Sequence, residues 1–205
     1  MRQDLRVLAF GDSLTEGYSN WGAQWTPYSE SKAFEAILDA TGDVFQIVVE
    51  GQSGDFAIAF RRRMEQRYST TSTRSPLYDW AIVLGGTNDL AYGRGAKEIF
   101  DALVDISNIP LEHGAKVLML TVPECQHRSE GLERRRTELN DLIMNDGRRN
   151  VYKLDLHAAI PYHAMDKEER EKIWDDGLHL TPEGYERMGK VVAERLVELI
   201  KETKE

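Results

Sequence analysis

A serine follows directly on the first apolar segment of the chain, in a position where it could act as a nucleophile. Residues 11–17 read Gly-Asp-Ser-Leu-Thr-Glu-Gly and come after the apolar run 5–10. A buried strand that runs into such a turn presents the Ser13 hydroxyl at the edge of a sheet, where substrates bind. Because a serine hydroxyl is a weak nucleophile at neutral pH, the same site must also supply a base.

The partners that such a serine needs occur in three later segments. Asp176 and His179 lie in Asp-Asp-Gly-Leu-His, while Gly54 and Asn88 follow two further apolar runs. Histidine suits the base, because its ordinary pKa of about 6.5 lies near neutrality. A carboxylate orients the imidazole. The N–H groups of Ser13 and Gly54, with the side-chain amide of Asn88, suit the stabilisation of an oxyanion. These residue types predict acyl transfer.

Apolar segments rich in β-branched residues predict strands at 5–10, 45–50, 79–85, 115–122 and 151–156. Runs such as Ile47-Val48-Val49 are continuous, which is typical of strands buried on both faces of a parallel sheet. Helix-like segments alternate with them at 30–40, 55–67, 95–108, 130–145 and 182–203. This alternation predicts right-handed βαβ units and an α/β fold, a three-layer α/β/α sandwich around a five-stranded parallel sheet.

The predicted sheet would bring the chemistry-bearing residues together. Ser13, Gly54 and Asn88 follow the first, second and third strands, and Asp176 and His179 follow the fifth. Ligands bind beyond the carboxyl ends of parallel strands. We therefore expect all of these residues at one edge of the sheet.

These residues form four blocks in chain order, and through them the chain resembles the SGNH hydrolases of the GDSL type. The blocks are Gly-Asp-Ser-Leu-Thr at 11–15, the glycine at 54, Gly-Thr-Asn-Asp at 86–89 and Asp-x-x-His at 176–179. The resemblance spans residues 11–184. It implies a flavodoxin-like sandwich with Ser13 as nucleophile, His179 as base and Asp176 as its partner. It also implies an oxyanion hole of Ser13, Gly54 and Asn88, and neither a metal nor an organic cofactor.

Some positions leave alternatives open. The family often has an asparagine shortly before the glycine of the second block, where this chain has Glu50-Gly51-Gln52-Ser53-Gly54. Gly51 is therefore an alternative to Gly54 as oxyanion donor. Asp175 is an alternative to Asp176, which the family spacing favours. Asp12 is expected to organise the turn through backbone hydrogen bonds rather than to act in the chemistry.

The substrate is less determined by the sequence. Loops 18–28, 90–94, 123–129 and 157–175 would line the catalytic edge, and they supply the candidate substrate contacts Tyr18, Trp21, Trp25, His127 and Trp174. Aromatic side chains there could stack on a sugar or an aryl group or hold an acyl chain, or simply pack. A carboxylesterase for short or medium acyl chains is the first hypothesis. Carbohydrate O-deacetylase, lysophospholipase and acyl thioesterase activities are alternatives, and a non-enzymatic binding module is the remote rival.

Composition excludes several classes of protein. The 205 residues suit one domain, 1–205, and the net charge of −9 argues against a nucleic-acid partner. No apolar run approaches the roughly 18 residues of a membrane span. No signal-type segment precedes the first strand, so we expect a cytoplasmic protein, with a removed presequence as the alternative. The expected partner is a small-molecule ester, and the oligomeric state is not predicted.

Two basic triplets run against the acidic average. Arg61–Arg63 and Arg134–Arg136 each lie in a helix-like stretch with acidic neighbours. A solvated helix face is the first interpretation of such a triplet, and a docking site for an acidic substrate is the alternative.

Overall fold

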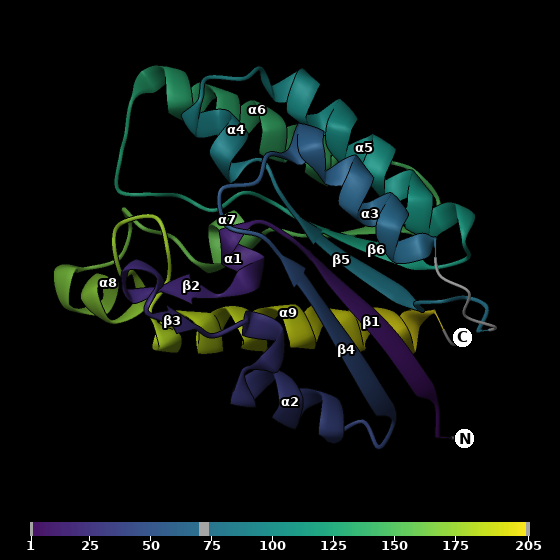
Figure 1. Ribbon diagram of the computed structural model, residues 1–205. Coiled ribbons are helices and arrows are strands. Elements are labelled where there is room, and N and C mark those ends of the chain that lie inside the picture. The colour runs from purple at the N-terminus through teal and green to yellow at the C-terminus, as the bar shows by residue number, and fades with distance from the viewer. Residues whose placement is uncertain (1, 70–73, 204–205) are drawn as a thin grey trace.

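The computed structural model describes residues 2–69 and 74–203 (Figure 1). Within them, a parallel sheet has the order β4-β1-β5-β6-β7. Its strands are β1 (Asp4–Gly11), β4 (Val44–Gly51), β5 (Trp80–Leu84), β6 (Lys116–Leu120) and β7 (Val151–Leu154). Each strand coincides with a segment that the sequence predicts, although β1 and β4 extend one residue beyond it at each end. The five-stranded parallel sheet is confirmed.

Helices cover both faces of the sheet, as the alternation of side chains along β1 illustrates. Leu5, Val7 and Ala9 belong to the core cluster that includes side chains of α2 (Lys32–Asp39) and α9 (Pro182–Glu202). Leu8 and Phe10 point to the other face and join the cluster of α3 (Phe60–Tyr68), α5 (Ala96–Glu112) and α6 (Glu130–Met144). Figure 1 shows the two helical layers on either side of the strands, so the three-layer sandwich is confirmed.

The segments at the carboxyl edge are more ordered than the loops that we expected. They contain the short helices α1 (Ser13–Glu16), α4 (Thr87–Ala91), α7 (Leu156–Ala159) and α8 (Lys167–Ile173). They also contain the 3₁₀ turns η1 (Asn20–Gly22) and η2 (Tyr28–Glu30). A third 3₁₀ turn, η3 (Ala57–Ala59), lies within the segment 55–67 that the sequence predicts as helical. An antiparallel hairpin of β2 (Tyr18–Ser19) and β3 (Gln24–Trp25) follows α1.

Helix α8 corrects the expectation of a continuous loop over 157–175. The Asp166 side chain caps it by accepting a hydrogen bond from Glu169 N at 2.9 Å. Ion pairs four residues apart support its exposed face, and Ile173 is its buried side chain. A helix held by capping and charge, with so little apolar periodicity, gives only a weak sequence signal.

None of the helices in the described ranges combines the length with the apolar character needed to cross a bilayer.

Two carboxyl groups are buried where α1 and α4 begin, just beyond the ends of β1 and β5. Asp12 is fully buried, and its Oδ1 accepts a hydrogen bond from Leu14 N at 3.0 Å, which caps α1. Asp89 is also fully buried, and its Oδ2 accepts one from Ala57 N at 2.8 Å. Burial, with a smaller contribution from the nearby Asp89 carboxyl, raises the pKa of Asp12 to about 7 against the lowering effect of the Leu14 N–H. Asp12 thus organises the serine turn, as its position in the sequence indicates.

The raised pKa of Asp12 predicts a specific pH dependence of stability. A carboxyl whose folded pKa exceeds its unfolded value favours folding while it is neutral, and this contribution is lost as the pH rises towards about 7. Asp12→Asn keeps an oxygen for Leu14 N but cannot ionise. We expect its unfolding free energy, relative to wild type, to increase by about 1 kcal/mol or more between about pH 5 and about pH 8. Urea denaturation at both pH values measures the difference.

Asp105→Asn, at an exposed position on α5, is the control for the loss of one negative charge. A difference between Asp12→Asn and wild type that stays constant with pH, or matches the control, would contradict the prediction.

Candidate active site

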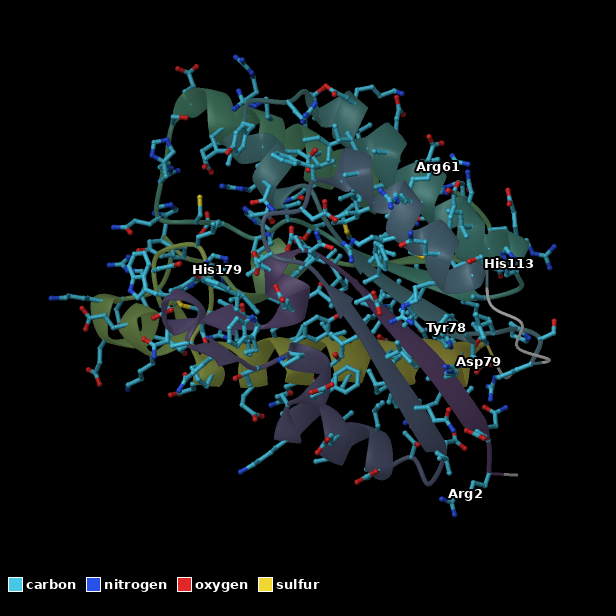
Figure 2. All side chains as sticks on the ribbon, viewed as in Figure 1. Arg2, Arg61, Tyr78, Asp79, His113 and His179 are labelled. Atoms are coloured by element: carbon cyan, nitrogen blue, oxygen red, sulfur yellow. The ribbon has the colours of Figure 1, made fainter. Side chains whose placement is uncertain are left out.

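The serine, histidine and aspartate singled out by the sequence lie in one hydrogen-bonded series. His179 Nε2 is 2.9 Å from Ser13 Oγ, and His179 Nδ1 is 2.8 Å from Asp176 Oδ2. Ser13 is the first residue of α1, and His179 comes from the segment before α9. Figure 2 shows His179 at the carboxyl edge of the sheet, whereas His113 and Asp79 lie towards its opposite end. The topology therefore brings together residues separated by 166 positions.

Asp176 and Asp175 have different partners. Asp176 Oδ1 accepts hydrogen bonds from His179 N at 2.8 Å and Leu178 N at 3.0 Å, in addition to the ring contact of Oδ2. Burial alone would raise the pKa of Asp176, but these hydrogen bonds outweigh it and hold the pKa below its usual value. Asp175 Oδ2 instead accepts from Asn20 N at 2.6 Å, in the β2–β3 hairpin. Of the two carboxylates, Asp176 lies against the imidazole.

The loop that carries His179 is closed on itself. Trp174 and Leu180 form an antiparallel bridge, and Asp175 N donates to His179 O at 2.9 Å. Gln126 N also donates to Gly177 O at 2.6 Å, which ties this loop to the segment after β6. These contacts fix the backbone of the loop before and after His179, and so fix the position of the imidazole.

Three N–H donors lie on the segments that follow β1, β4 and β5, and each has a hydrogen with no acceptor in the described ranges. Within the described ranges, neither Ser13 N nor Gly54 N donates to any acceptor. Asn88 Nδ2 donates one hydrogen bond, to Asp55 O at 2.8 Å. An amide nitrogen carries two hydrogens, so the second N–H of Asn88 is left for a ligand. The arrangement suits stabilisation of an oxyanion.

Gly51 and Gly54 occupy different environments. Gly51 is the last residue of β4, and a Cβ there would lie 2.1 Å from Glu16 N, so glycine is needed for the close approach of α1. Gly54 has a φ of 77° and open space around the position of a Cβ. Close packing accounts for Gly51, whereas Gly54 adopts a left-handed turn and its N–H has no acceptor in the described ranges.

Arg63 is a positioning residue that the sequence did not reveal. Its guanidinium donates to Gly11 O at 2.7 Å, to Glu50 O at 3.0 Å and to Asp55 Oδ2 at 2.8 Å. These acceptors lie at the ends of β1 and β4 and directly after Gly54. The solvated-face interpretation of the first basic triplet is therefore wrong for its third member, which is half-buried and stacked on the Phe10 ring.

The predicted substrate contacts divide into three groups. The Tyr18 ring lies 4.6 Å from the His179 ring, which places it directly at the site. Trp21 and Trp25, on the hairpin beside it, are 81% and 55% exposed. Trp174 is only 4% exposed, and its indole N–H donates to Pro161 O at 3.2 Å. We correct the expectation for Trp174, because in this structure its side chain packs in the core.

His127 lies on a hollow of about 350 Å³ between α4, α6 and the loop that contains Gly177 and Leu178. We call it the α4–α6 hollow. Its apolar wall includes Leu90 from α4, Leu132 from α6 and Leu178 from that loop. The hollow is next to the catalytic edge, because Leu178 directly precedes His179. It was not evident in the sequence, since its walls come from three distant segments.

Solved structures of low sequence identity share this fold. A member of the lipolytic protein G-D-S-L family from Veillonella parvula superposes with a TM-score of 0.72 at 20% identity, covering 92% of this chain and 96% of that one. An aryl esterase of M. smegmatis gives 0.67 at 22% identity, covering 95% and 99%. A lipase/acylhydrolase from Enterococcus faecalis gives 0.69 at 18% identity, covering 96% and 95%.

A sequence relative is also found. The chain is 29% identical over 119 residues to a multidomain esterase of Ruminococcus flavefaciens, a match that covers 54% of this chain and 14% of that protein. The chain thus spans only a small part of the length of that relative. The family model of the GDSL-like lipases and acylhydrolases matches residues 9–187, from within β1 to within α9. On that match, which includes every residue of the site described above, the chain belongs to the GDSL-like lipase/acylhydrolase family.

Proposed function

We propose that this chain is a serine esterase that hydrolyses carboxylic esters through an acyl-enzyme intermediate. The observation that carries the proposal is the hydrogen-bonded series Ser13, His179, Asp176 beside the unpartnered N–H groups of the same edge. Membership of the GDSL-like lipase/acylhydrolase family supports the same chemistry.

In the first half-reaction, Ser13 Oγ attacks the ester carbonyl carbon while its proton moves to His179 Nε2. The negative charge that develops on the carbonyl oxygen is stabilised by the N–H groups of Ser13, Gly54 and Asn88. When the tetrahedral intermediate collapses, the carbon–oxygen bond to the alcohol breaks and His179 gives its proton to that oxygen. The alcohol leaves, and the acyl group remains on Ser13.

In the second half-reaction, water takes the place of the alcohol. It attacks the acyl carbon while His179 accepts its proton, and the proton then returns to Ser13 Oγ as the acid departs. Asp176 stays ionised throughout, because its hydrogen bonds hold its pKa below the usual value. Its charge stabilises the imidazolium that forms twice in each cycle.

The first prediction concerns the nucleophile and the acyl chain length. Wild-type protein should hydrolyse p-nitrophenyl acetate and butyrate better than octanoate and palmitate, because the α4–α6 hollow, to which we assign the acyl group below, measures about 350 Å³, near the lower limit for ligand pockets. Ser13→Ala should lose at least about 1000-fold in kcat, because the covalent step then has no nucleophile. Release of p-nitrophenol measures both. Circular dichroism checks that the variant is folded, and full turnover by a folded variant would exclude Ser13 as the nucleophile.

The neighbouring carboxylates provide a matched pair of variants. Asp176→Asn should lower kcat by about 10³- to 10⁴-fold, because the amide stabilises the wrong imidazole tautomer and no longer stabilises the imidazolium. Asp175→Asn should lower kcat by less than about 10-fold, because it alters only the contact to Asn20 N. Both are assayed with p-nitrophenyl acetate. Similar losses in the two variants would argue against a distinct role for Asp176.

One observation favours a second substrate class, O-acetylated carbohydrate. Trp21 and Trp25 present exposed indole rings on the hairpin next to Tyr18 and His179, and exposed tryptophans are suited to stacking on sugar rings. Trp21 lies between β2 and β3, and its φ of 54° is unusual for a bulky residue.

If the hairpin binds a sugar, Trp21→Ala should raise KM for an acetylated xylo-oligosaccharide by about 10-fold, the loss of one stacking contact. Its KM for p-nitrophenyl acetate should stay within about 2-fold of wild type, since that small ester does not reach the hairpin tip. Acetate release measures the first reaction. Equal changes for the two substrates would argue against sugar stacking.

A further inference from the structure

The α4–α6 hollow contains a cation that no other group of the described chain neutralises. Arg135, from α6, lines the hollow and is half-buried. Its guanidinium donates to Leu90 O at 3.3 Å, while its Nε is buried and has no acceptor. No carboxylate lies within 4.0 Å of it in the ranges 2–69 and 74–203.

This situation distinguishes Arg135 from the other arginines that are partly or fully buried. In the part of the chain that the structure describes, each of the others either has a carboxylate within 4.0 Å or stacks on an aromatic ring. Arg136, the next residue in the chain, is an example, since its Nη1 lies 2.7 Å from Glu133 Oε1. Removing a guanidinium from water without an anion costs free energy, so a bound anion would complete the hollow.

The electrostatics of the hollow agree with an anionic ligand. None of its lining residues is acidic, although the chain has a net charge of −9. The nearest catalytic carboxylate, Asp176, already accepts hydrogen bonds on both oxygens. His127 adds an exposed imidazole to the same wall as Arg135. Around these polar groups the wall is apolar, as an alkyl chain requires.

The hollow lies on the side of the site where an acyl chain would extend. The leaving oxygen must approach His179 Nε2, and the Tyr18 ring and the hairpin lie against that imidazole. The hollow is lined by residues of α4 and α6 together with Gly177 and Leu178, which precede His179. In Figure 1 the β2–β3 hairpin lies instead beside α8 and α9, away from α4 and α6. An ester bound at Ser13 could therefore extend its acyl part towards the hollow and its alcohol part towards the hairpin.

We propose that the α4–α6 hollow binds the acyl part of the substrate and that Arg135 pairs with a carboxylate at the far end of a short acyl chain. This inference rests on the proposed esterase function and narrows its substrate class to half-esters of short dicarboxylic acids. Arg135 belongs to the second basic triplet, for which docking of an acidic substrate was the alternative interpretation.

The test compares two esters of the same shape. In p-nitrophenyl hemiglutarate the acyl chain ends in a carboxylate, and in p-nitrophenyl 5-methylhexanoate an isopropyl group replaces it. Wild type should prefer the charged ester in kcat/KM. In Arg135→Met the ratio of the two kcat/KM values should fall at least about 10-fold, the size of one charge-assisted hydrogen bond. Arg135→Lys should keep part of the preference, because it keeps the charge without the guanidinium fork.

The ratio separates recognition from a structural role. If Arg135 only supports α4 through Leu90 O, both esters should slow equally in Arg135→Met and the ratio should match wild type, which would overturn the proposal. Arg134→Met, at the exposed preceding position, is the matched control and should leave the ratio unchanged. Ser13-dependent hydrolysis of the neutral ester with an unchanged ratio would overturn this inference while leaving the esterase function intact.

A binding measurement tests the anion site at Arg135 independently of ester hydrolysis. Ligand-observed NMR with free glutarate should show binding to wild type and weaker binding to Arg135→Met. If neither ester is hydrolysed, the proposed function fails, and the glutarate experiment alone then tests the hollow. Absent or equal binding in the two proteins would overturn the anion site.

Discussion

The geometry of the site depends on holding the carboxyl ends of β1 and β4 in fixed relation to the loop that follows β4. Arg63 does this with one side chain, because its guanidinium donates to Gly11 O, Glu50 O and the Asp55 carboxylate. The main-chain carbonyl of Asp55 in turn accepts from Asn88 Nδ2. A planar guanidinium with several donors in fixed directions is suited to this role in a way that lysine is not. The proposed oxyanion donors therefore come from three strand ends that are connected through Arg63 and Asp55.

Burial of charge is the second constraint on this edge. Asp12 caps the helix that begins with Ser13, and Asp89 follows Asn88 in α4, so both buried carboxyls adjoin residues that we assign to the chemistry. Burying these carboxyls costs free energy, and burial raises the pKa of both, with Asp89 adding to the rise at Asp12. The two destabilising carboxyls lie at the starts of α1 and α4, where the backbone carries the proposed catalytic groups. A loss of folding stability in exchange for a preorganised site is a common property of enzymes.

Much of this arrangement could be predicted from the sequence, and the physical reason is the parallel sheet. Continuous apolar runs such as Ile82-Val83-Leu84 mark buried strands, and residues after such strands meet at one edge. The contacts among Ser13, His179 and Asp176 lie where that reasoning places them. Family spacing then favoured Asp176 over Asp175, in agreement with the observed partner of the imidazole.

What could not be predicted depends on long-range contacts with little local signal. Arg61 and Arg63 are alike in the sequence, but the first is an exposed member of a surface ion pair and the second joins two strand ends. Trp174 precedes the catalytic block, and nothing local indicates that its ring turns into the core. The β2–β3 hairpin has strands of two residues each, too short for an alternating pattern.

The adjacent carboxylates Asp175 and Asp176 connect the two sides of the site. One holds Asn20 N at the tip of the hairpin, where Asn20 and Trp21 both have positive φ, and the other holds the imidazole. The contact to the hairpin and the contact to the imidazole therefore come from neighbouring residues of one loop. The acyl side is different, because α4 and α6 are connected to the core through Leu90 and Leu139. The acyl group that we propose for the α4–α6 hollow would contact these two core-packed helices, and the leaving alcohol would lie on the side of the hairpin.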